Sequence, residues 1–219
     1  MLTKYLSPLI YGIDASNNVV LGSNEYDYIH NNTILNLLKE HKKVVFDNVF
    51  NASIDWLPEG ITHIQLGTFF NQPLQKLPST LKSLIIKTYN EVGATYFNNS
   101  LNNLPHGLEI LEIHYNHKFN KDINNLPQTL KRLYMHCKAC KINFNMLPNS
   151  LEHIIIYGDN NVINPINTIC TMPTNLQSIK MCNYRIDLDN LEKLQFSNFR
   201  DLRNEYPNIH FIYLDTSEE

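Results

Sequence analysis

The chain has no long apolar run and little net charge. No apolar stretch reaches the roughly 18 residues that a transmembrane helix needs, and residues 1–8 lack the continuous apolar core of a signal peptide. Its 18 Lys and Arg against 21 Asp and Glu leave a net charge of −3, so no overall field attracts nucleic acid or an anionic membrane. We therefore expect a cytoplasmic protein that binds neither.

Recognised catalytic and metal-binding motifs are also missing. The sequence contains no Gly-rich phosphate loop and no His-Glu-x-x-His motif, so we expect no catalytic residue, no cofactor and no enzymatic activity. It has 4 cysteines, which without a secretion signal should be reduced. Cys137 and Cys140 have the spacing of one zinc knuckle, but a structural zinc site usually takes two, and Cys170 and Cys182 form no second one. We expect structural thiols and no metal.

The sequence has instead a short phrase that recurs, Leu-Pro followed at fixed distances by more aliphatic residues. The phrase begins at Leu57, Leu77, Leu104, Leu126, Leu147 and, with Met in place of Leu, at Met172. Self-similarity with a period mostly in the low twenties predicts a solenoid, in which each repeat forms one coil. Below, position n means n residues after this Leu or Met. Positions seven and nine are aliphatic or Met, the period of two that places both side chains on one face of a strand.

A second signature precedes Leu-Pro in several copies. It reads Phe-Asn-x-x-aliphatic, with its Phe seven residues before the Leu, and occurs at Phe50-Asn51, Phe70-Asn71, Phe97-Asn98 and Phe119-Asn120. We predict that the Asn side chain hydrogen-bonds to the backbone of the neighbouring coil and so satisfies polar groups that a tight bend leaves unpaired. Pro suits a turn and not a strand, and position three holds turn formers such as Gly60 and Thr80. A turn should therefore precede each strand.

This combined pattern resembles the FNIP repeat, a variety of leucine-rich repeat found mainly in social amoebae and giant viruses. The resemblance covers residues 43–191. It implies an α/β-type solenoid dominated by β, right-handed, with one short parallel strand per coil and a curved, concave sheet. It also implies a non-enzymatic protein-interaction module, located in the host cytoplasm if the protein is viral. Some relatives carry an N-terminal F-box that couples them to ubiquitin ligases.

Solenoids need caps at both ends, because the first and last coils would otherwise expose core to water. We expect an N-terminal capping segment at 1–42, the repeats at 43–191 and a C-terminal cap at 192–219. The first cap should contain a hairpin (9–13 with 19–21) and a short helix after Asn32, before a first strand at 44–46. The second should contain a helix from Ser197 to Tyr206 and a strand at 209–214. An F-box would need three helices, which disfavours the ligase-adaptor alternative.

If positions seven and nine point inward, positions six, eight and ten form the exposed face of the sheet. This face should hold an apolar and aromatic patch with polar residues around it, and our candidate partner-binding residues are Ile85, Ile110, Glu112, His114, Arg132, Tyr134, His136, Ile155 and Tyr157. Exposed patches of this kind usually mark contact sites, and Tyr and Arg dominate interface energetics. The alternative is that Ile simply suits strands.

His114 and His136 share position ten, so we expect them to lie about 4.8 Å apart, one inter-strand spacing. Two such histidines could bind a metal or catalyse, but no column of carboxylates or nucleophiles accompanies them. We interpret them as half-exposed surface residues. The expected function is that of an interaction module whose partner is an unknown protein or peptide. The first alternative is a ubiquitin-ligase adaptor, and the second is an enzyme or metal protein. We expect a monomer.

Overall fold

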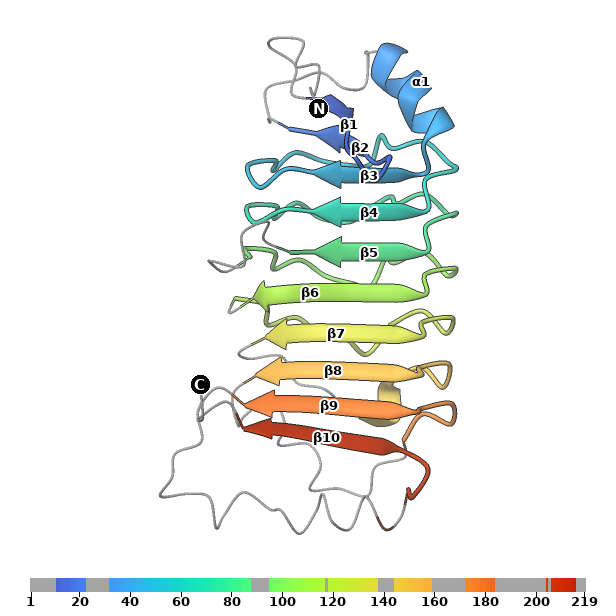
Figure 1. Cartoon of the computed structure of the whole chain (residues 1–219), viewed down its shortest axis with the longest axis vertical. Helices are drawn as coiled ribbons and strands as arrows, with labels where there is room; N and C mark the ends of the chain where they lie inside the picture. Colours follow the sequence, from blue (N-terminus) through green and yellow to red (C-terminus); the bar gives the residue numbers. More distant parts are fainter. Residues whose placement is uncertain are drawn as a thin grey trace.

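The computed structural model describes residues 11–22, 32–87, 95–116, 118–137, 144–158, 172–183, 204 and 206–215. Its elements, in chain order, are β1 (Tyr11–Ile13), β2 (Val19–Leu21), α1 (Asn32–Glu40), β3 (Lys43–Phe46), β4 (His63–Leu66), β5 (Ser83–Ile86), β6 (Ile110–Asn116), β7 (Arg132–Cys137), η1 (Phe144–Met146), β8 (His153–Gly158), β9 (Ser178–Asn183) and β10 (His210–Asp215). These strands form a single sheet in sequence order (Figure 1).

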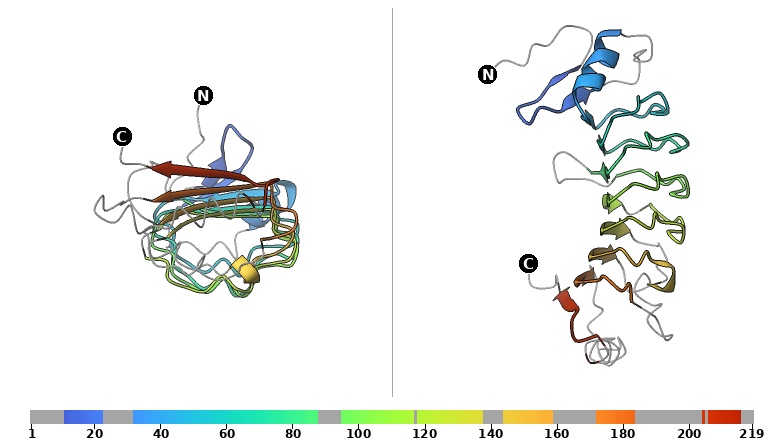
Figure 2. Two further views of the ribbon diagram at one scale, coloured as in Figure 1. Left: turned by 90° about the horizontal axis from the view of Figure 1, so that it is seen from below. Right: turned by 90° about the vertical axis from the view of Figure 1, so that its right-hand side faces the viewer.

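From β2 to β10 every neighbouring pair of strands is parallel, and only β1 pairs antiparallel, with β2. Each parallel strand belongs to a successive coil, so the sheet forms one side of the stack and the connecting segments form the other (Figure 2). The predicted strand-dominated solenoid with one strand per coil is confirmed. The β1–β2 hairpin and α1 lie where the sequence pattern places them.

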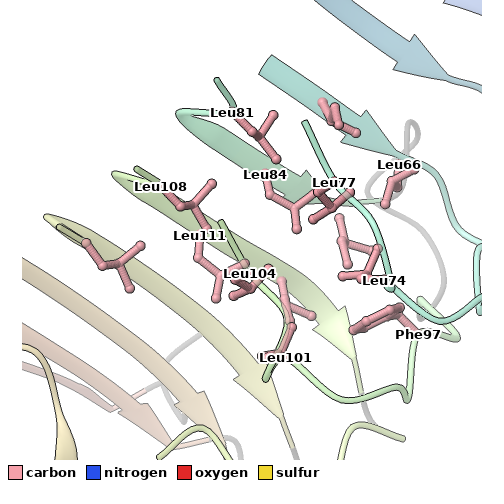
Figure 3. Close-up of a cluster of buried hydrophobic side chains, with 14 of the residues drawn as sticks. Leu66, Leu74, Leu77, Leu81, Leu84, Phe97, Leu101, Leu104, Leu108 and Leu111 are labelled. Carbon is pink, nitrogen blue, oxygen red and sulfur yellow. The ribbon is translucent and has the colours of Figure 1, made fainter. Parts of the chain in front are cut away.

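The core lies between the sheet and the connecting segments. The register places position seven of one strand beside position seven of the next, as in Ile64, Leu84 and Leu111, and these side chains are fully or almost fully buried. Leucines of the connecting segments, such as Leu101 and Leu104, face them from the other side (Figure 3). Each coil therefore buries its apolar residues both within itself and against its neighbours, which a single repeat could not do.

The turns that precede the strands also connect successive coils. In five copies the carbonyl of the Leu-Pro or Met-Pro proline accepts a hydrogen bond from the backbone N–H at position four, as between Pro78 and Leu81. Hydroxyls at position three then donate to the previous coil: Thr80 Oγ1 to the carbonyl of Ile61 at 2.8 Å and Ser150 Oγ to that of Leu130 at 2.7 Å. The predicted turns are confirmed, and their side chains additionally fix one coil on the next.

On the opposite side of the coil, the Phe-Asn signature forms two ladders. The Phe50, Phe70, Phe97 and Phe119 side chains are fully buried, and their rings stack at centroid distances of 6.4, 6.2 and 6.2 Å. Beside them, Oδ1 of each Asn accepts a hydrogen bond from the backbone N–H of the next: Asn51 from Asn71 at 2.8 Å, Asn71 from Asn98 at 2.9 Å and Asn98 from Asn120 at 3.1 Å. The predicted Asn contacts to the neighbouring coil are confirmed.

At the C-terminal end, β10 pairs parallel with β9, close to the strand predicted at 209–214. The helix predicted between Ser197 and Tyr206 lies outside the described residues except for Asn204 and Tyr206. The predicted capping role of both end segments stays a prediction.

Candidate interaction surface

The alternation of side chains along each strand leaves one face of the sheet exposed. In β4, for example, Ile64 and Leu66 are buried whereas His63 and Gln65 are partly exposed. We call this surface between β5 and β9 the open face. Its partly buried or exposed members are Ile85, Lys87, Ile110, Glu112, His114, Arg132, Tyr134, His153, Ile155, Tyr157, Ser178 and Lys180.

The register brings most of the predicted site residues together. At position eight the neighbours across the strands are Ile85, Glu112, Tyr134, Ile155 and Lys180, in that order. At position six Ile110 lies beside Arg132, which lies beside His153. The open face is therefore a continuous surface of mixed aliphatic, aromatic and charged side chains that crosses five strands.

Aromatic rings form the centre of the open face. The His114 and Tyr134 rings stack with centroids 3.9 Å apart, and the Tyr134 and Tyr157 rings are tilted at 5.4 Å. Lys180 Nζ lies 5.9 Å from the Tyr157 ring centroid. Rings held against one another lose little conformational freedom when a ligand covers them, which favours their use in recognition.

Glu112 is the acidic residue within this group and has two basic neighbours. Its Oε2 atom lies 2.9 Å from His114 Nε2, and its Oε1 atom lies 3.9 Å from Arg132 Nη1. The hydrogen bond to His114 is the main cause that lowers the pKa of Glu112 below its usual range; partial burial opposes it, and the charges of His114, Arg132 and Lys87 add to it. The carboxylate is thus held in place within the face, while the Arg132 side chain stays 51% exposed.

One residue that was predicted on the exposed face, His136, is buried. Only 2% of its surface is exposed, and its ring packs 5.6 Å from that of Tyr157. It also does not pair with His114, because the β6–β7 register shifts between Ile113 and Asn116. The expectations of a half-exposed His136 and of a stacked histidine pair are therefore wrong.

The cause of this shift is a β-bulge that absorbs extra length in β6. The segment from position nine to the ladder Phe is longer here, Ile113 to Phe119, than in the coil from Leu66 to Phe70. Beyond the bulge, Asn116 is buried and its Oδ1 accepts hydrogen bonds from the backbone N–H groups of Lys118 and Phe119. The two additional residues thus let Asn116 fix the turn into the Phe ladder. Spacing alone does not indicate the bulge, because the segment from Ile86 to Phe97 is longer still and the β5–β6 register is regular.

Sequence reasoning missed a second exposed surface. The residue before each ladder Phe points outward, and together these form a ridge of Val49, Phe69, Tyr96 and Lys118. The first three are 39–52% exposed; Phe69 and Tyr96 stack at 5.3 Å, and Lys118 Nζ lies 4.1 Å from the Tyr96 ring centroid. The signal was available in the sequence, since this position is apolar or aromatic in three successive copies.

Neither surface gathers metal ligands. Within the described ranges, no three His, Cys, Asp or Glu side chains lie close enough to hold a metal ion. Cys140 and Cys170 fall outside those ranges, as do the side chains of Cys137 and Cys182, so the predicted structural role of the thiols stays a prediction. No helix in the described part of the chain has the length and apolar character to cross a membrane.

Part of the repeat region matches a known protein family. Residues 50–89 match the FNIP Repeat family, over the coils that contain the first rungs of the Phe and Asn ladders. This confirms the resemblance drawn from the Leu-Pro and Phe-Asn signatures. None of the curated proteins matches the chain significantly.

Proposed function

We propose that this chain, of which residues 50–89 match the FNIP Repeat family, is a non-enzymatic interaction module whose open face binds a protein or peptide. A repeat solenoid suits this role because its stacked coils present an extended surface of side chains on a rigid frame. The proposed contact residues are Ile85, Ile110, Glu112, His114, Arg132, Tyr134, Ile155 and Tyr157. His136 is removed from this group because it is buried.

One observation carries the proposal: aromatic and aliphatic side chains occupy the face of the sheet that the protein's own core does not use. The core side of the same strands already buries positions seven and nine, so folding needs only polar residues on the other face. Instead Ile85, Tyr134 and Ile155 lie in adjacent or nearby strands at position eight, with Tyr157 tilted against Tyr134. Such residues gain free energy when a partner removes them from water.

The adaptor alternative has less support. Of the N-terminal segment, the structure describes residues 11–22 and 32–42, which form a hairpin and one helix. An F-box-like bundle would need further helices, and no contact of the described residues favours one.

The proposal is tested by selecting peptides from a random phage-displayed library on the immobilised protein. We expect the wild type to enrich peptides that a Tyr134→Ala/Tyr157→Ala variant does not retain, because the variant loses both central rings. A Phe69→Ala/Tyr96→Ala variant is the matched control, since it also removes two exposed, mutually packed aromatic rings, but from the ridge. Circular dichroism must show that both variants fold.

The control also shows which result would contradict the proposal. If the ridge variant loses the selected peptides and the open-face variant keeps them, the working surface is the ridge. If the wild type enriches no peptide that depends on Tyr134 and Tyr157, the open face does not bind peptides.

A further inference from the structure

The open face has a charge of the opposite sign to the chain as a whole. Of its described side chains, Lys87, Arg132 and Lys180 are positive and Glu112 is negative, whereas the chain carries −3. We propose that the partner is an acidic peptide segment that places an apolar or aromatic side chain over Tyr134 and carboxylates beside the flanking cations. This rests on the proposed function and deepens it by naming the chemistry of the partner.

Glu112, the carboxylate among the described side chains of the face, does not cancel these cations. Glu112 is engaged by the His114 ring at 2.9 Å, and its contact to Arg132 is longer, at 3.9 Å. The Arg132 side chain is half exposed, so its guanidinium retains donors for a second carboxylate, which it can bind through two parallel hydrogen bonds. Complementary charge of this kind steers a partner to the surface and fixes its orientation.

The positions of the cations set the spacing of the acidic residues. Lys87 follows β5 and Lys180 lies in β9, so each is two strands away from Tyr134 in β7. Two inter-strand spacings amount to about 10 Å, and an extended peptide advances about 3.3 Å per residue. A peptide that crosses the strands should therefore carry an acidic residue about three positions on either side of its central apolar residue.

The same observations favour a peptide over a nucleic acid. Phosphate backbones are held by clustered Lys and Arg, whereas the cations here are spread over five strands with Glu112 between them. The central aromatic rings of the face could stack on bases, but Ile85, Ile110 and Ile155 beside them could not. These three aliphatic side chains match aliphatic and aromatic side chains of a peptide.

The test uses the same phage-displayed library and reads the composition of the selected pool. We expect the pool selected by the wild type to be enriched in Asp and Glu around a central apolar residue. A Lys87→Glu/Lys180→Glu variant should lose this enrichment and favour Lys and Arg. The matched control is Lys76→Glu/Lys121→Glu, which makes the same charge change at two exposed lysines on the segments between strands and should keep the acidic pool.

A synthetic, fluorescein-labelled copy of the most enriched peptide then gives affinities by anisotropy. Its affinity should fall about tenfold or more when salt rises from about 0.1 M to about 1 M, because the Debye length shrinks from about 10 Å to about 3 Å. A labelled single-stranded oligonucleotide serves as the competing polyanion. If it binds more tightly than the peptide and depends on Tyr134 and Tyr157, the partner is a nucleic acid and the inference is overturned.

Failure of this inference can be told from failure of the proposed function. A pool that depends on Tyr134 and Tyr157 but has no excess of acidic residues overturns the inference and leaves the interaction module standing. Absence of any such pool overturns both.

Discussion

The two sides of this solenoid use the repeat in different ways. The connecting segments opposite the sheet form what we call the coil side. There, four stacked coils keep the same two residue types, Phe and Asn, which form the buried ring stack and the Asn ladder. On the open face, position eight changes at every coil, from Ile85 through Glu112, Tyr134 and Ile155 to Lys180. The coil side depends on particular chemistry, whereas the open face requires only that its side chains point away from the core.

The reason for this difference lies in what each side chain contacts. A ladder Asn accepts a hydrogen bond from the same position of the next coil, so a replacement must supply an acceptor at the same place. A residue at position eight contacts neighbours whose type differs from coil to coil, and its backbone hydrogen bonds are made whatever its side chain is. Side chains at position eight can therefore change from coil to coil without loss of the backbone hydrogen bonds of the sheet.

The comparison is tested most strongly by two adjacent phenylalanines. Phe70 is fully buried between Phe50 and Phe97, whereas Phe69 is 48% exposed on the ridge. Phe70→Ala should lower the free energy of unfolding by about 3–5 kcal/mol, because it leaves a cavity in the ring stack. Phe69→Ala should change it by less than about 1 kcal/mol, in the range of surface substitutions. Urea unfolding followed by fluorescence of Trp56, the single tryptophan, measures both; equal losses would contradict the division into two sides.

The second test concerns Gly67, directly after β4, where the backbone of the previous coil lies close to its Cα. A Cβ added at Gly67 would lie 2.3 Å from the carbonyl oxygen of Asp47, whereas at Gly107 the nearest atoms are 3.6 Å away. Gly67→Ala should therefore destabilise the protein by about 1–3 kcal/mol through backbone displacement, and Gly107→Ala should be tolerated. Thermal unfolding of both variants checks this; a stable Gly67→Ala would show that the coils can separate at low cost.

The repeat columns and His136 show what the sequence could and could not predict. The strand columns, the buried Phe stack and the Asn contacts all follow from residue types that recur at fixed spacing, so the core and its register were predictable. The prediction that His114 and His136 lie side by side failed, because the β6–β7 register shifts between Ile113 and Asn116. A column argument assumes equal register in every coil and fails where that register shifts.

The open face was predictable only in part, because spacing in the sequence shows which strand positions are exposed but not how their side chains contact one another. Period-two alternation identifies its residues, and Ile85, Glu112, Tyr134 and Ile155 occupy adjacent strands as expected. The engagement of Glu112 by His114 depends on side-chain geometry that no spacing encodes. The ridge was not predicted, although its residues, of which Phe69 is an example, directly precede the Phe of the Phe-Asn signature.

The Asn ladder provides a weaker test, because its hydrogen bonds lie near the surface. Asn71 Oδ1 accepts from Asn98 N and from Asn99 Nδ2, both at 2.9 Å. Asn71→Ala should cost about 1 kcal/mol, the net value of a typical hydrogen bond. Asn71→Asp should recover most of this loss, because a carboxylate oxygen accepts from the same donors. Urea titrations of the two variants compare them, and equal stability of Asn71→Ala and wild type would show that the ladder contributes nothing.

The smallest expected effect is on the open face, where Glu112 contributes a pH dependence. Contacts with His114 and Arg132 lower the pKa of Glu112 in the folded protein below its usual value of 4.5, so the folded state favours the charged form. The stability from this interaction is complete above that value and is lost as pH falls through the lowered pKa. Glu112→Gln cannot lose a charge, so its unfolding midpoint should fall less steeply with acid than that of the wild type.

The comparison variant for this measurement is Glu109→Gln, at the residue directly before β6. The pKa of Glu109 is also lowered, chiefly by hydrogen bonds to Lys131 and Lys82, but both lysines are about half exposed, and solvent screens such pairs. Urea midpoints are measured from about pH 3 to about pH 7, a range that spans carboxyl titration. The dependence of the midpoint on pH should therefore be reduced more in Glu112→Gln than in Glu109→Gln. The reverse order would mean that the surface ion pairs, and not the Glu112 group, set the acid sensitivity of the solenoid.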